Sequence, residues 1–166
     1  WTIRLIDTGL ATLTAGRLKR LMPYIGNEPF FMTWGDGVSS VDLDALLAFH
    51  RKQGRIATVT AVRPPSRFGA LEIDGDCVTS FTEKPQIGEG WINGAFFVVE
   101  PEVADYLPEN ADEMSLETSV LVGLARDGQL SAYKHEGFWQ CMDTLRDKVR
   151  LERLWKSEQA PWKTWE

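Results

Sequence analysis

The alternation of apolar and polar positions predicts a regular exchange of strands and helices in the first part of the chain. Strands are expected where apolar residues alternate or form a short run, and helices where they recur at spacings of three and four. In chain order these segments are a strand at 1–6, a helix at 18–25, a buried strand at 29–34, a helix at 42–53 and a strand at 56–62. This order favours an α/β sandwich with parallel strands over a barrel or a helical bundle.

The rest of the chain is richer in strands. Asp74, Gly75 and Asp76 separate two short apolar runs, which predicts a hairpin. The other segments are a strand at 91–99, a helix at 116–126, a strand at 130–135, a loop at 137–144 and a closing helix at 145–156. No repeat, low-complexity segment or linker-like stretch interrupts the pattern, so residues 1–166 are expected to form a single domain.

The composition is that of a globular domain and narrows the range of partners. The 166 residues are 43% hydrophobic, and 18 Lys and Arg against 24 Asp and Glu give a net charge of −6. Without a basic run, nucleic acid is not an expected partner. Without an apolar stretch of about 20 residues, a membrane is not an expected partner either.

The cysteines and the first residues of the chain give two further expectations. The isolated Cys77 and Cys141 favour a reducing cytoplasm. The chain starts within an expected strand and without Met, so it is expected to be incomplete at its N-terminus.

Two aspartates at the ends of elements are the main candidates for chemistry. Asp36 lies between two glycines after a strand, where open α/β sheets place metal or phosphate sites. Asp143 comes just before the closing helix. Each also has an ordinary explanation, because Asp36 suits a turn and either Asp143 or Thr144 suits a helix N-cap. If the two carboxylates converge, they match the one or two carboxylates that Mg²⁺ combines with substrate phosphates and water.

Charged residues elsewhere offer weaker indications. Pro85 favours extended geometry at Lys84, where a lysine can act as a point charge for a phosphate. Glu83 could accept hydrogen bonds from sugar hydroxyls, although both residues could equally be solvated surface groups. The polar loop before the first helix, with Arg17, could hold an anion at the helix N-terminus.

The two histidines do not favour nucleophilic catalysis. His50 stands beside Arg51 and Lys52 and is expected at the surface, and His135 is expected at the end of a strand. Neither forms a pattern typical of a Ser-His-Asp or Cys-His centre.

Six motifs, taken in order, resemble those of the sugar-1-phosphate nucleotidyltransferases. They are Thr14-Ala15-Gly16-Arg17-Leu18-Lys19-Arg20, Gly35-Asp36-Gly37, Arg67-Phe68-Gly69-Ala70-Leu71, Phe81-Thr82-Glu83-Lys84-Pro85, Ile92-Asn93-Gly94-Ala95-Phe96-Phe97 and Phe138-Trp139-Gln140-Cys141-Met142-Asp143-Thr144. The similarity covers essentially the whole chain and is strongest to members that use CTP. It implies a Rossmann-like nucleotidyltransferase sandwich with a mixed, mainly parallel sheet that lacks its N-terminal strands. The chain would then be the C-terminal two-thirds of such a domain.

The resemblance assigns roles to individual residues. In that family the aspartates that match Asp36 and Asp143 bind the catalytic Mg²⁺, and the lysine that matches Lys84 contacts the sugar phosphate. These three residues are therefore the expected catalytic group. The nucleotide site is matched by Thr12, Arg17, Gly35 and Asp36. The glucosyl pocket is matched by Gly69, Glu83, Lys84, Asn93 and Gly94.

Two departures from the family pattern are visible. The family's glycine-rich loop of the form GGxGTR, which with a nearby lysine cradles the nucleotide triphosphate, does not occur in these 166 residues. In addition, Ala15 stands where close relatives usually have glycine.

The implied reaction converts CTP and α-D-glucose 1-phosphate into CDP-glucose and pyrophosphate, for deoxysugar and O-antigen polysaccharide synthesis. The attacking phosphate oxygen is already anionic, so this chemistry needs positioning and charge neutralisation rather than a strong base.

Other interpretations of the same residues remain open. A sister enzyme could use UTP or dTTP, and without the glycine-rich loop the chain could be a non-catalytic module that binds sugar phosphate or forms oligomers. A glycosidase with Asp36 and Asp143 as its carboxylate pair is a further alternative. A homo-oligomer is expected, and the Trp-rich tail at 160–166 could be an interface or fold back on its own core.

Overall fold

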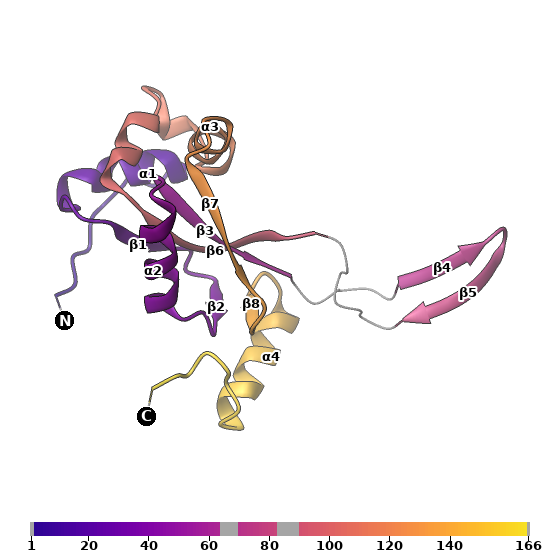
Figure 1. The fold of residues 1–166 in the computed structure, drawn as a ribbon. Helices are drawn as coiled ribbons and strands as arrows, with labels where there is room; N and C mark the ends of the chain where they lie inside the picture. Colours follow the sequence, from indigo (N-terminus) through magenta and orange to yellow (C-terminus); the bar gives the residue numbers. More distant parts are fainter. Residues whose placement is uncertain (1, 64–69, 83–89, 166) are drawn as a thin grey trace. The chain divides into compact units, whose positions relative to one another are not determined.

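The computed structural model describes residues 2–63, 70–82 and 90–165 (Figure 1). The chain divides into two compact units. The first consists of Trp1–Thr33, Leu43–Val59 and Phe96–Tyr133, and the second of Trp34–Asp42, Thr60–Ala95 and Lys134–Glu166.

A four-stranded sheet has the order β1-β6-β3-β7. Its strands are β1 (Phe30–Thr33), β3 (Ala57–Val62), β6 (Ile92–Val99) and β7 (Leu130–His135). β1 is antiparallel to β6, with Phe30 opposite Val99. The Glu100 amide donates to the Ile56 carbonyl at 2.8 Å, and Gly94, six residues earlier, lies beside the Thr60 carbonyl, so β3 also runs opposite to β6. The predicted α/β fold with a mixed sheet is therefore confirmed.

Helices occur at each segment predicted to be helical, but the first one begins and ends four residues before the predicted 18–25, and a 3-10 turn that contains Pro23 follows it. The α-helices are α1 (Thr14–Leu21), α2 (Leu43–Gln53), α3 (Val122–Arg126) and α4 (Leu145–Lys156). α3 continues a π-helical turn, η4 (Glu117–Leu121), and the 3-10 turns are η1 (Met22–Tyr24), η2 (Pro101–Tyr106) and η3 (Ala111–Glu113). Within the described residues, no helix combines the length and the apolar character that crossing a bilayer requires.

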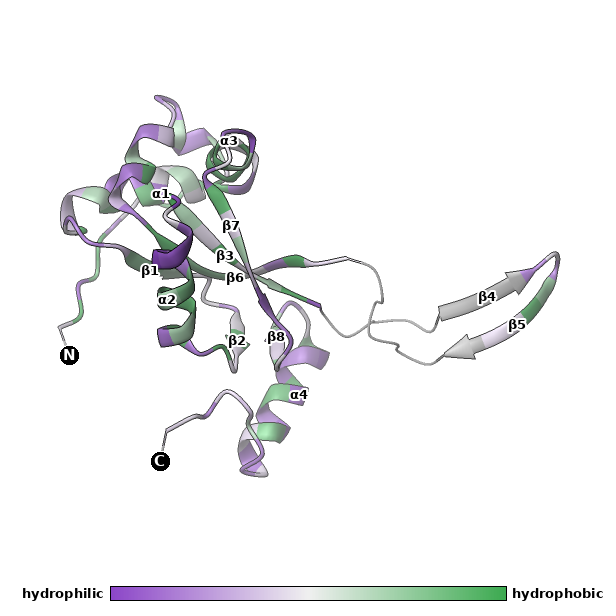
Figure 2. Ribbon diagram, viewed as in Figure 1, coloured by the Kyte–Doolittle hydropathy of each residue, from purple (hydrophilic) through white to green (hydrophobic). Residues whose placement is uncertain are grey.

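The core of the first unit joins β6 to two helices. Phe97 and Val98 of β6, Leu46 of α2 and Leu124 of α3 are completely buried. β6 is strongly apolar along this part of its length, as its green colour in Figure 2 shows. Such a continuous apolar run is typical of a strand that is covered on both faces.

The second unit contains two small antiparallel pairs. The predicted hairpin is present as β4 (Ala70–Asp74) and β5 (Cys77–Thr82), with Gly75 at φ +57° in the turn. The other pair is β2 (Gly37–Ser39) with β8 (Trp139–Cys141). This pair was not predicted, because β8 lies in a segment expected to be a loop and both strands are only three residues long.

Three local expectations were wrong. The segment 2–6 is not a strand, and Ile3 and Leu5 are 77% and 92% exposed. β1 is only partly buried, with Phe31 47% exposed, because it is the last strand in the described sheet order. His50 is not a surface residue but is 1% exposed, which fits its position one helical turn after the buried Leu46.

Candidate functional site

Asp36 and Asp143 meet at one end of the β2–β8 ribbon. In this antiparallel pair Gly37 lies opposite Cys141. The Met142 amide donates to the Asp36 carbonyl at 2.7 Å, and Asp143 is the next residue. Both aspartates are exposed. The strands β2 and β8, which lie far apart in the sequence, therefore place the backbone at Asp36 next to that at Met142, one residue before Asp143.

The helix cap after β8 is made by Thr144 and not by Asp143. The Asp147 amide donates to the Thr144 hydroxyl at 3.2 Å, and the Thr144 amide donates to the Asp147 carboxylate at 3.1 Å. This reciprocal pair is a capping box. Because the capping role is taken, the ordinary explanation for an aspartate at position 143 does not apply. A contact that Asp143 does make is with the Cys141 thiol, which donates to its carboxylate at 3.2 Å.

At the other end of the ribbon, hydrogen bonds connect Phe138 to Ser39 and Ser40. The Ser40 amide and the Ser39 hydroxyl donate to the Phe138 carbonyl at 2.9 and 3.0 Å, and the Phe138 amide donates back to the Ser40 hydroxyl at 3.0 Å. His135 Nε2 lies 3.2 Å from the same carbonyl. These bonds hold β2 and β8 in register, and therefore hold the backbone of Asp36 beside that of Met142, the residue before Asp143.

The donor set at the aspartates fits Mg²⁺. Within the described part of the chain, no group of three or more His, Cys, Asp or Glu could hold a metal ion by itself. Two exposed carboxylates are, however, what Mg²⁺ uses when substrate phosphates and water complete its six ligands. The residues present therefore suit a metal that binds together with a phosphorylated substrate.

Asn93 and Gly94 form a tightly packed corner at the start of β6. The Asn93 side chain accepts from the Ala95 amide at 2.8 Å, and Ala95 has φ +62°. Gly94 is buried, and a Cβ there would lie 2.9 Å from the Thr60 carbonyl oxygen. Its own carbonyl accepts from the Trp139 indole at 2.8 Å. Trp139 belongs to β8, so this hydrogen bond links the predicted sugar-binding residues to the ribbon that carries Asp143.

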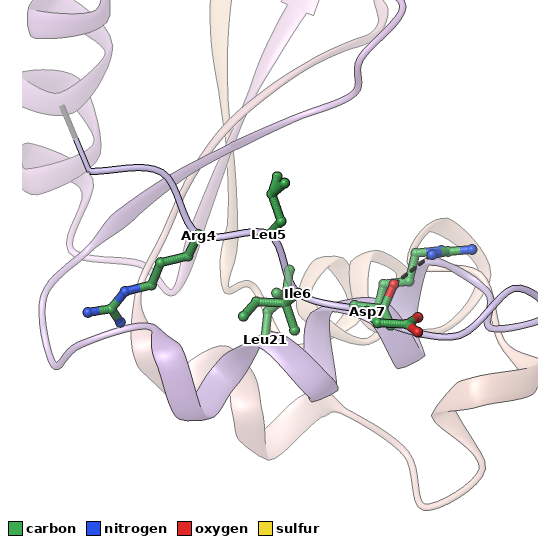
Figure 3. Close-up of a pocket in the computed structure, with 7 residues that line it drawn as sticks. Arg4, Leu5, Ile6, Asp7 and Leu21 are labelled. Carbon is green, nitrogen blue, oxygen red and sulfur yellow. Dashed lines mark hydrogen bonds between the residues drawn. The ribbon is translucent and has the colours of Figure 1, made fainter.

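Arg17 lines an open pocket in the first unit. The pocket has a volume of about 610 Å³, and its lining residues are Arg4, Leu5, Ile6, Asp7, Thr8, Arg17 and Leu21 (Figure 3). Ile6 and Leu21 lie together in it. Arg17 donates to the Thr8 hydroxyl at 2.6 Å and to the Leu10 carbonyl at 3.4 Å. Thr12, the other nucleotide-site candidate in this unit, is 7% exposed.

The remaining candidates are Gly35, Gly69, Glu83 and Lys84. A Cβ added at Gly35 would meet no atom within 4 Å, so the backbone beside Asp36 is open to a ligand. Gly69, Glu83 and Lys84 lie outside the described residues.

Sequence reasoning missed the residues that support the site, namely Ser39, Ser40 and Trp139. Their signal is weak because two three-residue strands leave no measurable alternation. The aromatic pair Phe138-Trp139, shortly before Asp143, was the available indication of a packed segment at 137–144.

Comparisons with known proteins find a matching family model and similar proteins. Residues 8–151 match a family model described as nucleotidyl transferase. The chain is 50% identical over 167 residues to a glucose-1-phosphate cytidylyltransferase of Salmonella typhi, which covers 100% of this chain and 64% of that protein. It is 31% identical over 141 residues to the catalytic subunit beta of a mannose-1-phosphate guanylyltransferase from Danio rerio, with 81% of this chain and 39% of that protein covered. The chain thus spans less than two thirds of the length of these relatives.

Solved structures show the same fold. A Bacillus anthracis protein in complex with a sucrose matches with a TM-score of 0.67 at 21% identity, over 92% of this chain and 64% of that one. HddC from Yersinia pseudotuberculosis, complexed with GMP-PN, matches with a TM-score of 0.58 at 22% identity, over 84% of this chain and 60% of that one.

Proposed function

The chain belongs to the nucleotidyl transferase family, and from that premise we propose that it carries the metal and sugar sites of a glucose-1-phosphate cytidylyltransferase. The reaction transfers a cytidylyl group from CTP to α-D-glucose 1-phosphate and gives CDP-glucose and diphosphate. The observation that supports the proposal is the backbone pairing of Asp36 with Met142, the residue before Asp143, at the end of the β2–β8 ribbon. The identity to the Salmonella cytidylyltransferase supports the choice of nucleotide and sugar.

In this mechanism the protein mainly positions charge. Asp36 and Asp143 would hold Mg²⁺, which when bound neutralises charge on the reacting phosphates. The attacking oxygen of glucose 1-phosphate is already anionic, so no side chain has to remove a proton from it. Positioning and charge neutralisation then account for most of the rate enhancement.

The chain's other candidates would bind the two substrates. Lys84 is proposed to contact the sugar phosphate, and the glucosyl group would lie against Gly69, Glu83, Asn93 and Gly94. Thr12, Arg17 and Gly35 are proposed to line the nucleotide site. The buried corner at Gly94 supports the sugar assignment, because its backbone is held rigidly by Thr60 and Trp139.

The broader setting is also proposed. Residues 1–166 would form one nucleotidyltransferase domain, and CDP-glucose would feed deoxysugar and O-antigen synthesis. The two isolated cysteines in the sequence, Cys77 and Cys141, support a reducing compartment such as the cytoplasm. Self-association into a homo-oligomer is expected, although Trp162 of the tail packs against Phe138, with ring centroids 5.4 Å apart.

The test is calorimetric titration of the chain with CDP-glucose, with and without Mg²⁺. The site variant is Asp36→Asn with Asp143→Asn. The matched control, Asp74→Asn with Asp76→Asn, removes two carboxylate charges from the β4–β5 turn of the same unit. We expect Mg²⁺-dependent binding in the wild type and the control and none in the site variant. A folded wild-type chain that binds equally well without Mg²⁺, or not at all, would contradict the proposal for this chain.

A second assay separates the alternatives. Formation of CDP-glucose from CTP, compared with UTP and dTTP at the same concentration, identifies the nucleotide. Preference for UTP or dTTP would replace cytidylyl transfer by a sister reaction. Mg²⁺-dependent binding without turnover of any nucleotide would indicate a non-catalytic module that binds sugar nucleotides.

A further inference from the structure

Two cationic side chains converge on one indole ring in the second unit. The guanidinium carbon of Arg63 lies 4.6 Å from the centroid of the Trp91 ring, and the Lys134 ammonium lies 5.5 Å from it. Arg63 and Lys134 are exposed, and Trp91 is half-buried. Such cation–π contacts hold each cation near the ring while leaving its hydrogen-bond donors available.

The cluster sits across three neighbouring strands. Arg63 directly follows β3, Trp91 directly precedes β6, and Lys134 is the fifth residue of β7. The order β6-β3-β7 makes these strands adjacent. The carboxyl ends of sheet strands are where α/β folds bind their ligands, and Arg63 and Lys134 both belong to such an end.

The cluster concentrates positive charge on a chain that is acidic overall. The net charge is −6, yet two cations share one ring. Among the described residues, the ion pairs Arg20–Asp112, Arg126–Asp127 and Lys148–Glu152 involve other side chains. Both cations lie near the same ring, so an anion that binds at this ring would be attracted by both positive charges.

We propose that Arg63, Trp91 and Lys134 form a binding site for a phosphate group. Arg offers a planar fork of donors that matches phosphate oxygens, and Lys adds a point charge. A phosphate dianion has the charge to neutralise both cations at once. Trp91 would hold both cations at one place through its ring.

The position of the cluster relates it to the sugar-binding corner. Trp91 precedes Asn93 by two residues, at the point where the chain enters β6. The phosphate could belong to a sugar phosphate, or to the phosphate chain of a nucleotide or its diphosphate product. The site does not depend on Asp36, Asp143 or Mg²⁺, and its failure would leave the proposed reaction untouched.

The experiment is a titration in metal-free buffer, followed by the indole N–H signal of Trp91 in ¹⁵N NMR. One arm uses glucose 1-phosphate and the other inorganic diphosphate. The signal is assigned with Trp91→Phe. The site variant is Arg63→Gln with Lys134→Gln, and the control is Arg51→Gln with Lys52→Gln, which removes an exposed Arg and an exposed Lys from α2. The NMR spectrum of each variant shows directly whether it is folded.

We expect the Trp91 signal to move on titration of the wild type and the control, and binding to weaken at least tenfold in the site variant. A smaller dissociation constant for glucose 1-phosphate would assign the site to a sugar phosphate, and a smaller one for diphosphate would assign it to a nucleotide's phosphates.

The proposal is overturned if the Trp91 signal does not respond to either anion. It is equally overturned if the site variant binds like the wild type, or if the control loses as much affinity as the site variant does. If the site variant does not fold, the single variants Arg63→Gln and Lys134→Gln provide the test, since each removes one charge and keeps the Trp91 signal. Each is expected to weaken binding, and unchanged binding in both would overturn the proposal.

Discussion

At the start of α4, the residues that stabilise the helix differ from the residue that is proposed to bind the metal. Thr144 and Asp147 satisfy the first amide groups of the helix, while Asp143 stands outside the cap. A helix cap contributes about 1 kcal/mol to the free energy of unfolding. An exposed carboxylate outside the cap contributes little.

Thr144→Ala is therefore expected to lower the free energy of unfolding by about 1 kcal/mol, whereas Asp143→Ala should change it by less than about 0.5 kcal/mol. Urea denaturation followed by circular dichroism measures both values. Equal losses in the two variants would show that Asp143 supports the fold in its own right.

Gly94 and Ala95 are adjacent, yet their substitutions should have opposite effects. Gly94→Ala places a Cβ 2.8 Å from Val62 Cγ1 and 2.9 Å from the Thr60 carbonyl oxygen, so we expect a loss of about 1–3 kcal/mol. Ala95→Gly removes a left-handed alanine at φ +62°, whose cost of about 1–2 kcal/mol exceeds the entropy penalty of glycine. Thermal unfolding of the two variants should shift the midpoint down and up, respectively. A stabilising Gly94→Ala would contradict the close approach of β6 to β3.

The helix α2 and two strands of the sheet are joined by hydrogen bonds that the sequence pattern does not predict. His50 of α2 contacts the Thr58 hydroxyl of β3 through Nδ1 at 2.9 Å and Glu100, just after β6, through Nε2 at 3.1 Å. Thr58 is completely buried. One imidazole therefore ties a helix to two strands of the sheet.

His50→Leu should lower the free energy of unfolding by about 1–3 kcal/mol, because it leaves the buried Thr58 hydroxyl without this partner. Adding Thr58→Val removes the stranded hydroxyl, so the double variant should lose less than the sum of the two single losses. Chemical denaturation of the four proteins completes the cycle. Additive losses would indicate that the His50–Thr58 contact contributes nothing.

The longer elements could be predicted from sequence, and the short ones could not. α2, β3, β6 and the β4–β5 hairpin have enough residues to show a period or a turn signal. β2 and β8 do not, and their pairing depends on contacts between distant residues. For the same reason Asp36 and Asp143 could each be chosen from the ends of elements, but the pairing of the two strands that carry them required the structure. His50 was misplaced because its charged neighbours outweighed its spacing from Leu46.

The molecule as a whole carries a conspicuously apolar, exposed segment before α1. Ile3, Leu5 and Leu10 are 77%, 92% and 101% exposed, and Leu13 is 47% exposed. Contiguous exposed apolar side chains generally mark a surface that another segment or another molecule covers. This exposed segment is therefore expected to promote self-association of the 166-residue chain in solution.

We expect this chain to bind the dye ANS and to self-associate as its concentration rises. Leu5→Ser with Leu10→Ser should reduce both effects, because these two side chains are the most exposed of the segment. Val122→Ser, at a 59% exposed position on α3, is the control and should change neither. Light scattering after gel filtration measures the association. A monomer at all concentrations, without ANS binding, would refute this expectation.

The capping box at Thr144 also determines how variation at the neighbouring position would appear in a selection. A library screened for expression or protease resistance would retain replacements of Asp143, because α4 keeps its cap in all of them. The same library screened for growth that depends on the sugar nucleotide would retain aspartate alone. The difference between the two enrichment profiles at this one codon would report on metal binding without any purified protein.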